Sequence, residues 1–190
     1  MRGLIRNPGH VDDLLADGAR PVVCDLESAL TPTVAEAIAG ADAVVFAAGA
    51  GPGSTAERKL TMDRDGALRL VEAAQLVGVP RYVMVSAVGA EAPPEGEEVF
   101  DVYLQAKAAA DEGLMRSALA WTVLRPGRLT DEPATGRVRL DVEPHRGEVT
   151  REDVAGVLDL VLHGQRAVGR VLYVNGGEQD PEAALDAAVR

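Results

Sequence analysis

The feature that most constrains the fold is an alternation of short apolar runs with longer helical segments. The apolar runs are rich in β-branched residues and stay apolar at consecutive positions, as in 44–46 and 83–85, which is typical of strands buried on both faces of a parallel sheet. The expected strands are 3–6, 21–25, 43–48, 81–87, 121–125 and 170–175, and the expected helices are 11–16, 33–39, 60–77, 100–117, 151–162 and 181–189. This order predicts an α/β fold, a doubly wound parallel sheet with helices on both faces.

Length and charge narrow the class of protein further. The 190 residues fit a single domain, because about 150 residues per domain is the usual length. The chain has 30 acidic and 19 basic residues, a net charge of −11, and no basic run longer than two residues. We expect no nucleic-acid partner, because duplex binding needs clustered Lys and Arg.

The lengths of the apolar stretches and the few Cys and His residues argue against a membrane span, a disulfide and a metal-ligand motif. The longest uncharged apolar stretch, 43–50, is far shorter than the roughly 20 residues of a membrane span, and no secretory signal opens the chain. We therefore expect a cytoplasmic protein that does not contact membranes. The single Cys24 predicts no internal disulfide, and His10, His145 and His163 lie too far apart for a metal-ligand motif.

The carboxyl ends of the expected strands mark the place of a site, because ligands of doubly wound sheets bind there. The residues that follow these strands are Arg6, Asp25, 48–53, 86–89 and 126–130. The sequence predicts that they share one rim of the sheet.

Two segments interrupt the alternation. In 136–149, the alternating polar and apolar residues 137–140 predict a short exposed strand or hairpin above the rim. We therefore expect one domain over 1–190 with a small substrate lobe at 127–150. The segment 91–98 has two prolines and four acidic residues and is interpreted as a solvated loop, with a mobile lid as the alternative.

Ser86, Tyr103 and Lys107 are the best candidates for catalysis. Tyr103 and Lys107 lie four residues apart on an expected helix, so they project from one face. A nearby ammonium lowers the pKa of a tyrosine from its usual value of about 10, and such a pair can exchange a proton with a carbonyl oxygen. Ser86, at a strand end, can hydrogen-bond the same oxygen. Taken singly, the spacing is common by chance and a strand-end serine is commonly a turn residue.

The order of these motifs resembles the short-chain dehydrogenase/reductase superfamily, and more narrowly its atypical, NmrA-like NAD(P)-binding group. The segments that carry the resemblance are 83–86 (Val-Met-Val-Ser), 103–107 (Tyr-Leu-Gln-Ala-Lys), 124–131 (Leu-Arg-Pro-Gly-Arg-Leu-Thr-Asp) and 151–155 (Arg-Glu-Asp-Val-Ala). The resemblance covers nearly the whole chain and implies a Rossmann-like fold. It implies that Ser86, Tyr103 and Lys107 are catalytic and that Lys107 also holds the nicotinamide ribose.

The same resemblance implies a set of cofactor contacts. The implied cofactor-binding residues are Arg6, Asp25, Leu26, Ala47, Ala48, Gly49, Ser86, Lys107, Pro126 and Gly127. Asp25 matches a strand-end contact with adenine, and 47–49 match a loop of small residues beside the adenine ribose. Arg6 closes the first strand and no acid appears before Asp12, which favours NADP over NAD, since an arginine there suits a 2′-phosphate. The alternative for Arg6 is an ordinary surface arginine.

The N-terminal segment departs from the family. A dinucleotide-binding fold opens with a strand, a glycine-rich loop and a helix, whereas this sequence begins at a strand that matches the family's second. The loop 49–53 cannot substitute, because it follows a different strand and Pro52 lacks a backbone donor. We expect the first strand and helix to be missing, with two open strand edges at the centre of the sheet. The chain is then a fragment, or another chain supplies these elements, or the two edges pair directly.

The sequence predicts an NAD(P)-dependent oxidoreductase that acts on a small carbonyl or hydroxyl compound. Three alternatives stay open: a non-catalytic NADP(H)-binding redox sensor or regulator with a protein partner, an NAD(P)-dependent epimerase that uses the same three residues, and a fold remnant without activity. The alanine-rich helix 100–117 also suggests a homo-oligomer, because members of the resembled group often pair through this helix.

Overall fold

The structure, a computed structural model, describes residues 1–190. The strands and helices are, in chain order, β1 (Arg2–Ile5), α1 (Val11–Ala16), β2 (Arg20–Val23), α2 (Thr31–Ile38), β3 (Ala43–Phe46), α3 (Ala56–Arg58), α4 (Ala67–Leu76), β4 (Arg81–Val85), α5 (Val99–Met115), β5 (Ala120–Pro126), β6 (Arg128–Thr130), β7 (Val138–Asp141), β8 (Glu148–Thr150), α6 (Arg151–His163), β9 (Arg170–Gly176) and α7 (Pro181–Ala188). A short 3₁₀ helix (Pro8–His10) precedes α1, and a π-helix (Lys59–Gly66) joins α3 to α4. Every expected strand and helix is present with ends shifted by at most two residues, except that the expected helix 60–77 is a π-helix over its first turns and an α-helix only from Ala67.

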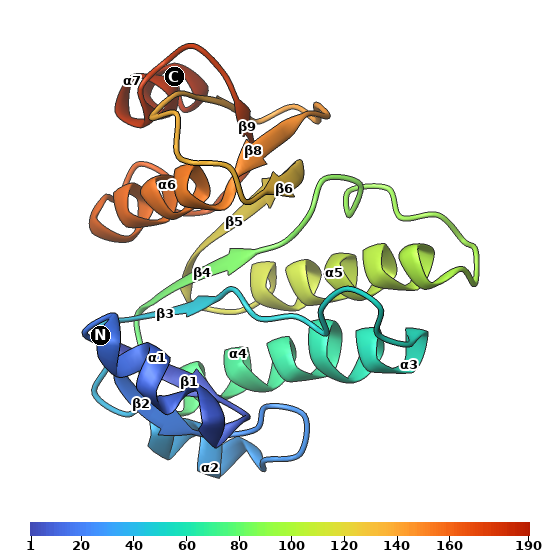
Figure 1. Cartoon of the computed structure of the whole chain (residues 1–190), viewed down its shortest axis with the longest axis vertical. Helices are drawn as coiled ribbons and strands as arrows, with labels where there is room; N and C mark the ends of the chain where they lie inside the picture. The colour runs from blue at the N-terminus through green and yellow to red at the C-terminus, as the bar shows by residue number, and fades with distance from the viewer.

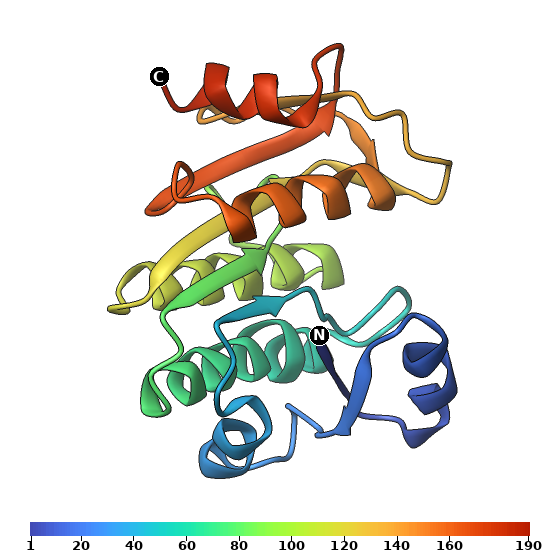
Figure 2. The same ribbon diagram turned by 90° about the vertical axis from the view of Figure 1, so that its left-hand side faces the viewer.

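Five strands form the main sheet in the order β3-β4-β5-β9-β7, in which only β7 is antiparallel to its neighbour (Figure 1). The central strand β4 serves two cores, because successive side chains point to opposite faces. Tyr82 and Met84 pack on the side of α2, α4 and α5, and Val83 packs on the side of α6 and α7. The uninterrupted apolar run of β4 is therefore covered on both faces (Figure 2), and the expected α/β fold with a mostly parallel sheet is confirmed.

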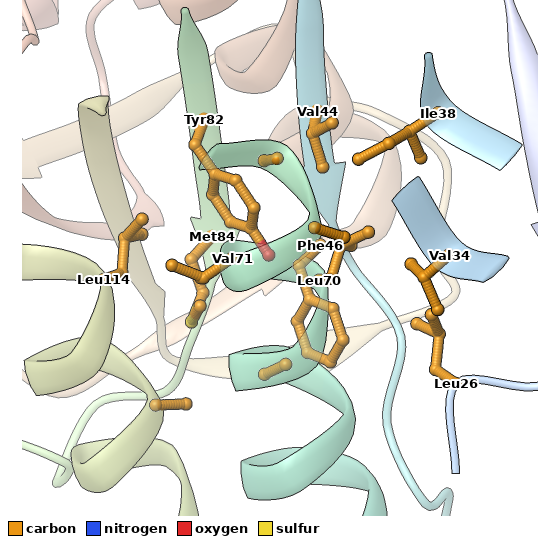
Figure 3. Close-up of a cluster of buried hydrophobic side chains, with 14 of the residues drawn as sticks. Leu26, Val34, Ile38, Val44, Phe46, Leu70, Val71, Tyr82, Met84 and Leu114 are labelled. Carbon is orange, nitrogen blue, oxygen red and sulfur yellow. The ribbon is translucent and has the colours of Figure 1, made fainter. Parts of the chain in front are cut away.

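The larger core lies between the sheet and α4 (Figure 3). Ala67, Leu70, Val71 and Ala74 of α4 are all nearly inaccessible, and their spacing places them on one helix face. Phe46 of β3 packs in the same cluster. This contact holds α4 against the sheet. It thereby positions the π-helix that directly precedes α4.

The segment 136–149 corrects one expectation. Strand β7 is not an exposed strand above the rim: Val138 and Leu140 are buried, and β7 is the outer strand of the main sheet, next to β9. The alternation was real, but its apolar face is covered by α7 and the core rather than by a separate lobe. Strands β6 and β8, too short for any periodicity, form a separate parallel pair. A substrate-binding role for 127–150 stays a prediction.

The N-terminal segment has the two open strand edges that the sequence predicts. Strand β1, which begins at Arg2, bonds only to β2, and β3 bonds only to β4, so direct pairing of the two inner edges is wrong. The structure does not show that a first strand and helix are missing. The pair β1–β2 is a small parallel sheet of its own (Figure 1). A cavity of about 850 Å³ lies between β1 and β3, and Leu4, Val44 and Val45 are among the residues that line it.

No helix in the structure combines the length and the apolarity that crossing a membrane requires.

The open edge of β3 generates a testable prediction. Val45 lines the cavity and its residue surface is 37% exposed, and an open apolar edge invites pairing with another chain. We expect the protein to associate as its concentration rises in sedimentation velocity, and Val45→Lys to weaken this association, because a charged side chain blocks edge pairing. Leu76→Lys, at an exposed apolar residue of α4, is the control and should associate like the wild type. Equal association of all three proteins would contradict the prediction.

Candidate active site

A cleft of about 520 Å³ opens at the carboxyl ends of β1, β2 and β3. Because parallel strands end at the same side of the molecule, residues far apart in the sequence meet there. Five residues of the predicted cofactor set line this cleft: Arg6, Asp25, Leu26, Ala48 and Gly49. Ala47 lines the cavity between β1 and β3 instead. The structure thus brings the N-terminal half of the predicted set to one cleft, and its part in binding stays a prediction.

Glu27 is the centre of an ion-pair cluster in this cleft. Its carboxylate accepts hydrogen bonds from Arg6 (2.9 Å), Arg58 (3.0 and 3.3 Å) and the Thr61 hydroxyl (2.8 Å). Burial pushes the pKa of Glu27 upward, but the hydrogen bonds from Arg58 and Thr61 and the charges of both arginines outweigh it and hold the pKa below its usual range. The sequence analysis missed Glu27 and Arg58, because no local spacing links residues 31 positions apart.

Asp25, the predicted adenine contact, closes a turn. Its carboxylate accepts hydrogen bonds from the backbone N–H of Glu27 (3.0 Å) and the hydroxyl of Ser28 (2.8 Å). This is a typical aspartate turn, and it aims Glu27 back toward Arg6. The Asp25 side chain therefore shapes the cleft wall directly after β2.

Lys107 is buried and held from two sides. Its ammonium donates to the carbonyl of Val85 at the end of β4 (3.0 Å) and lies 3.6 Å from a carboxylate oxygen of Asp63. Burial lowers the pKa of Lys107 more than the charges of Asp63 and Asp111 raise it. The ammonium is thus fixed at the end of β4.

Asp63 connects Lys107 to the cleft at the ends of β1, β2 and β3. Its second carboxylate oxygen accepts the backbone N–H of Ala50 (3.1 Å), and a Cβ at Gly49 would lie only 2.8 Å from the first. The π-helix places Asp63 here, because π turns reorient side chains relative to an α-helix, and this segment packs along α5. The sequence analysis expected residue 63 within the helix 60–77 and did not predict this contact.

Ser86 is engaged inside the fold. Its hydroxyl donates to Asp111 (2.8 Å), and the same carboxylate oxygen accepts a hydrogen bond from Arg125 (3.0 Å), which also donates to the Tyr173 hydroxyl (2.9 Å). Burial raises the pKa of Asp111 despite the opposing charge of Arg125. The Ser86 oxygen can still accept a hydrogen bond, but its proton is already donated to Asp111. Asp111 was missed, although residues 103, 107 and 111 continue one four-residue spacing along α5.

Tyr103 is largely covered and lies near two ammonium groups. The ammonium of Lys59 is 5.2 Å from its ring centre and that of Lys107 is 6.0 Å away. Burial and then the charges of Asp63 and Asp111 raise the pKa of Tyr103 to about 12. The expected lowering of this pKa by Lys107 is therefore wrong for the ligand-free protein. Tyr103 carries its proton at neutral pH, so it can donate a proton but is a poor base.

Pro126 and Gly127 do not reach the cleft. The Pro126 carbonyl accepts the backbone N–H of Val88 (3.1 Å), and a Cβ at Gly127 would clash with Asn175 and the backbone of Gly147. Glycine is required at position 127, because the backbone there lies too close to Asn175 and Gly147 for a side chain. No group of three or more His, Cys, Asp or Glu side chains is placed to hold a metal ion.

The tyrosines give a direct test of this electrostatic picture. Burial is the largest cause that raises the pKa of each of the three tyrosines, Tyr82, Tyr103 and Tyr173. We expect no phenolate absorbance with a midpoint near pH 10 in the folded protein, and three tyrosines titrating near pH 10 in denaturant. Because the folded values are raised, the stability that they contribute is complete below about pH 10 and is lost as the pH rises further. A native midpoint at or below pH 10 contradicts the picture.

The buried pair of Asp111 and Arg125 gives a second test. Asp111 is fully inaccessible, so Asp111→Asn leaves the buried Arg125 without its closest negative partner. We expect the free energy of unfolding in urea to fall by about 3 kcal/mol. Glu112→Gln removes the same charge from the next, exposed residue of α5 and should change it by less than about 0.5 kcal/mol. Equal losses in both variants would contradict a special role for the pair.

Several known proteins are similar to this chain in sequence and fold. A family model described as NAD(P)H-binding matches residues 1–164. An uncharacterized sugar epimerase of Bacillus subtilis, YhfK, is 34% identical over 97% of this chain and 86% of its own length. A UPF0659 protein of Saccharomyces cerevisiae is 36% identical over 85% of this chain and 74% of its own.

Two solved structures are similar across most of the chain. A protein of Bacillus halodurans, described as a candidate NAD-dependent epimerase/dehydratase, is 34% identical with a TM-score of 0.88 and covers 97% of this chain and 86% of its own. The oxidoreductase YlbE of Lactococcus lactis is 26% identical with a TM-score of 0.80, over 89% of this chain and 77% of its own.

Proposed function

Because the chain belongs to the NAD(P)H-binding family, we propose that it is an NAD(P)-dependent oxidoreductase of the atypical short-chain dehydrogenase/reductase type. Its substrate is a small carbonyl or hydroxyl compound. The observation that carries the proposal is the stripe of Tyr103, Lys107 and Asp111 on α5, which meets the strand-end Ser86 and the Asp63 contact to the nucleotide cleft.

The cleft at the ends of β1, β2 and β3 fits the adenosine part of a dinucleotide. Gly49 brings backbone close to Asp63 without a side chain, and Arg6 stands where a 2′-phosphate is recognised in such folds. We therefore propose NADP rather than NAD as the cofactor. Lys107 would hold the nicotinamide ribose, and the bound nicotinamide supplies or accepts the hydride.

The residues of α5 move the proton of the reaction. Tyr103 is protonated at neutral pH because its pKa is raised to about 12, so it donates its phenolic proton to the carbonyl oxygen in the direction of reduction. The ammonium of Lys107, 6.0 Å from the ring centre, then stabilises the phenolate. Ser86 orients the carbonyl once its hydroxyl turns from Asp111 toward the substrate.

Two other functions have observations in their favour. An epimerase uses the same three residues, and the B. subtilis and B. halodurans proteins are described in those terms. A non-catalytic redox sensor is favoured by the Ser86–Asp111 hydrogen bond, since in the ligand-free protein it turns the Ser86 hydroxyl proton away from a substrate.

Tyr103→Phe separates these functions. We expect NADPH to raise the melting temperature of the wild type and of Tyr103→Phe alike, by the shift that about 2.7 kcal/mol of binding free energy gives at 100 times the dissociation constant. Turnover of NADPH with a panel of small aldehydes, ketones and nucleotide sugars should fall by about 10²–10⁴-fold in the variant.

Other results have definite meanings. Equal shifts without turnover in either protein support the sensor, and isomerisation of a nucleotide sugar without net NADPH loss supports the epimerase. A wild type that melts cooperatively but responds to neither NADPH nor NADH would reject cofactor binding by this chain.

A further inference from the structure

We propose that Arg6, Arg58 and Thr61 form a seat for a phosphate monoester, and that the Glu27 carboxylate occupies this seat until a phosphate displaces it. The inference deepens the proposed function and rests on it, because the monoester that fits this cleft is the 2′-phosphate of NADP. Glu27 thereby sets how strongly the chain distinguishes phosphorylated from unphosphorylated adenosine.

The donors of the seat converge from three elements. Arg6 follows β1, Arg58 ends α3, and Thr61 lies in the π-helix. One Glu27 oxygen accepts from Arg6 at 2.9 Å and from Arg58 at 3.0 and 3.3 Å, and the other accepts from Thr61 at 2.8 Å. Two guanidinium groups and a hydroxyl around one anion are the set that binds phosphate in proteins, because the guanidinium fork matches its oxygens.

The seat does not depend on Glu27 for its shape. A second nitrogen of Arg58 donates to the carbonyl of Ala50 (3.0 Å), so this guanidinium stays in place when the carboxylate leaves. Arg6 has a side chain that is 53% exposed and is free to follow an incoming ligand. The Glu27 side chain is only 17% exposed, which places the anion at the floor of the cleft rather than on open surface.

The Glu27 carboxylate competes with a phosphate for the charges of Arg6 and Arg58. Asp25 and Glu27 offset the charges of Arg6 and Arg58 along the cleft wall, so a phosphate that carries about −1.5 to −2 charges would meet like charge if Glu27 stayed. A tethered carboxylate also acts at a high effective concentration. Phosphate must therefore expel it, and removing its charge should tighten phosphate binding selectively.

Isothermal titration calorimetry with two matched nucleotides tests the seat. Adenosine 2′,5′-bisphosphate and adenosine 5′-monophosphate differ only in the 2′-phosphate. We expect Glu27→Gln to bind the bisphosphate about tenfold more tightly than the wild type, with the monophosphate changed by less than about twofold. Glu57→Gln removes the same charge from an exposed residue of α3 and should match the wild type for both ligands.

Every outcome decides the proposal. An equal gain for both nucleotides, an equal gain in Glu57→Gln, or no gain at all overturns the seat. If Glu27→Gln does not fold, judged by circular dichroism and cooperative melting, Glu27→Asp replaces it, because the shorter side chain withdraws the carboxylate from Thr61 and should give a smaller gain of the same kind.

The same experiment separates the seat from the proposed function. A selective gain for the bisphosphate in a protein that binds neither NADPH nor NADH keeps the seat and rejects the dinucleotide site. Saturable binding of both dinucleotides with an unchanged preference in Glu27→Gln keeps the dinucleotide site and rejects the seat.

Discussion

The Asp63 carboxylate holds the two halves of the candidate site together. One oxygen lies 3.6 Å from the buried ammonium of Lys107, and the other accepts the backbone N–H of Ala50 at the edge of the nucleotide cleft. A buried carboxylate is tolerated only when it is paired and hydrogen-bonded. Asp63 therefore ties α5 to the loop after β3, and the cleft and the Lys107 side of α5 keep their relative positions, because loss of either partner would leave the buried Asp63 carboxylate less well paired.

The polar groups of α5 differ in how deeply they are buried along the helix. Asp111 is fully inaccessible and joins Ser86 to Arg125, which fixes the end of β4 against β5. Lys107 and Tyr103 lie one and two turns earlier, where the helix faces the loop after β3. The same four-residue spacing thus places Tyr103 where it is partly accessible and Asp111 in the core, because burial increases along α5 from its first turn.

The strands and helices were predictable from the sequence because each is encoded by a local period. The doubly buried β4 is a case in which a continuous apolar run predicted a strand that is covered on both faces. Five predicted cofactor residues also meet in one cleft, since the carboxyl ends of parallel strands share a side. The expectation that the strand at 137–140 is exposed was wrong. A period of two in the sequence identifies the apolar face of a strand but not the element that covers this face.

The sequence by itself determined which residues carry the α/β periodicity and that Ser86, Tyr103 and Lys107 stand at a strand end and on one helix face. Only the tertiary structure decided that Ser86 donates to Asp111, that burial and nearby carboxylates raise the pKa of Tyr103, and that Glu27 binds Arg6 and Arg58. It also decided that β1 and β3 do not pair. The physical reason is that backbone periodicity is local, whereas burial, charge pairing and edge pairing depend on which distant segments meet in space.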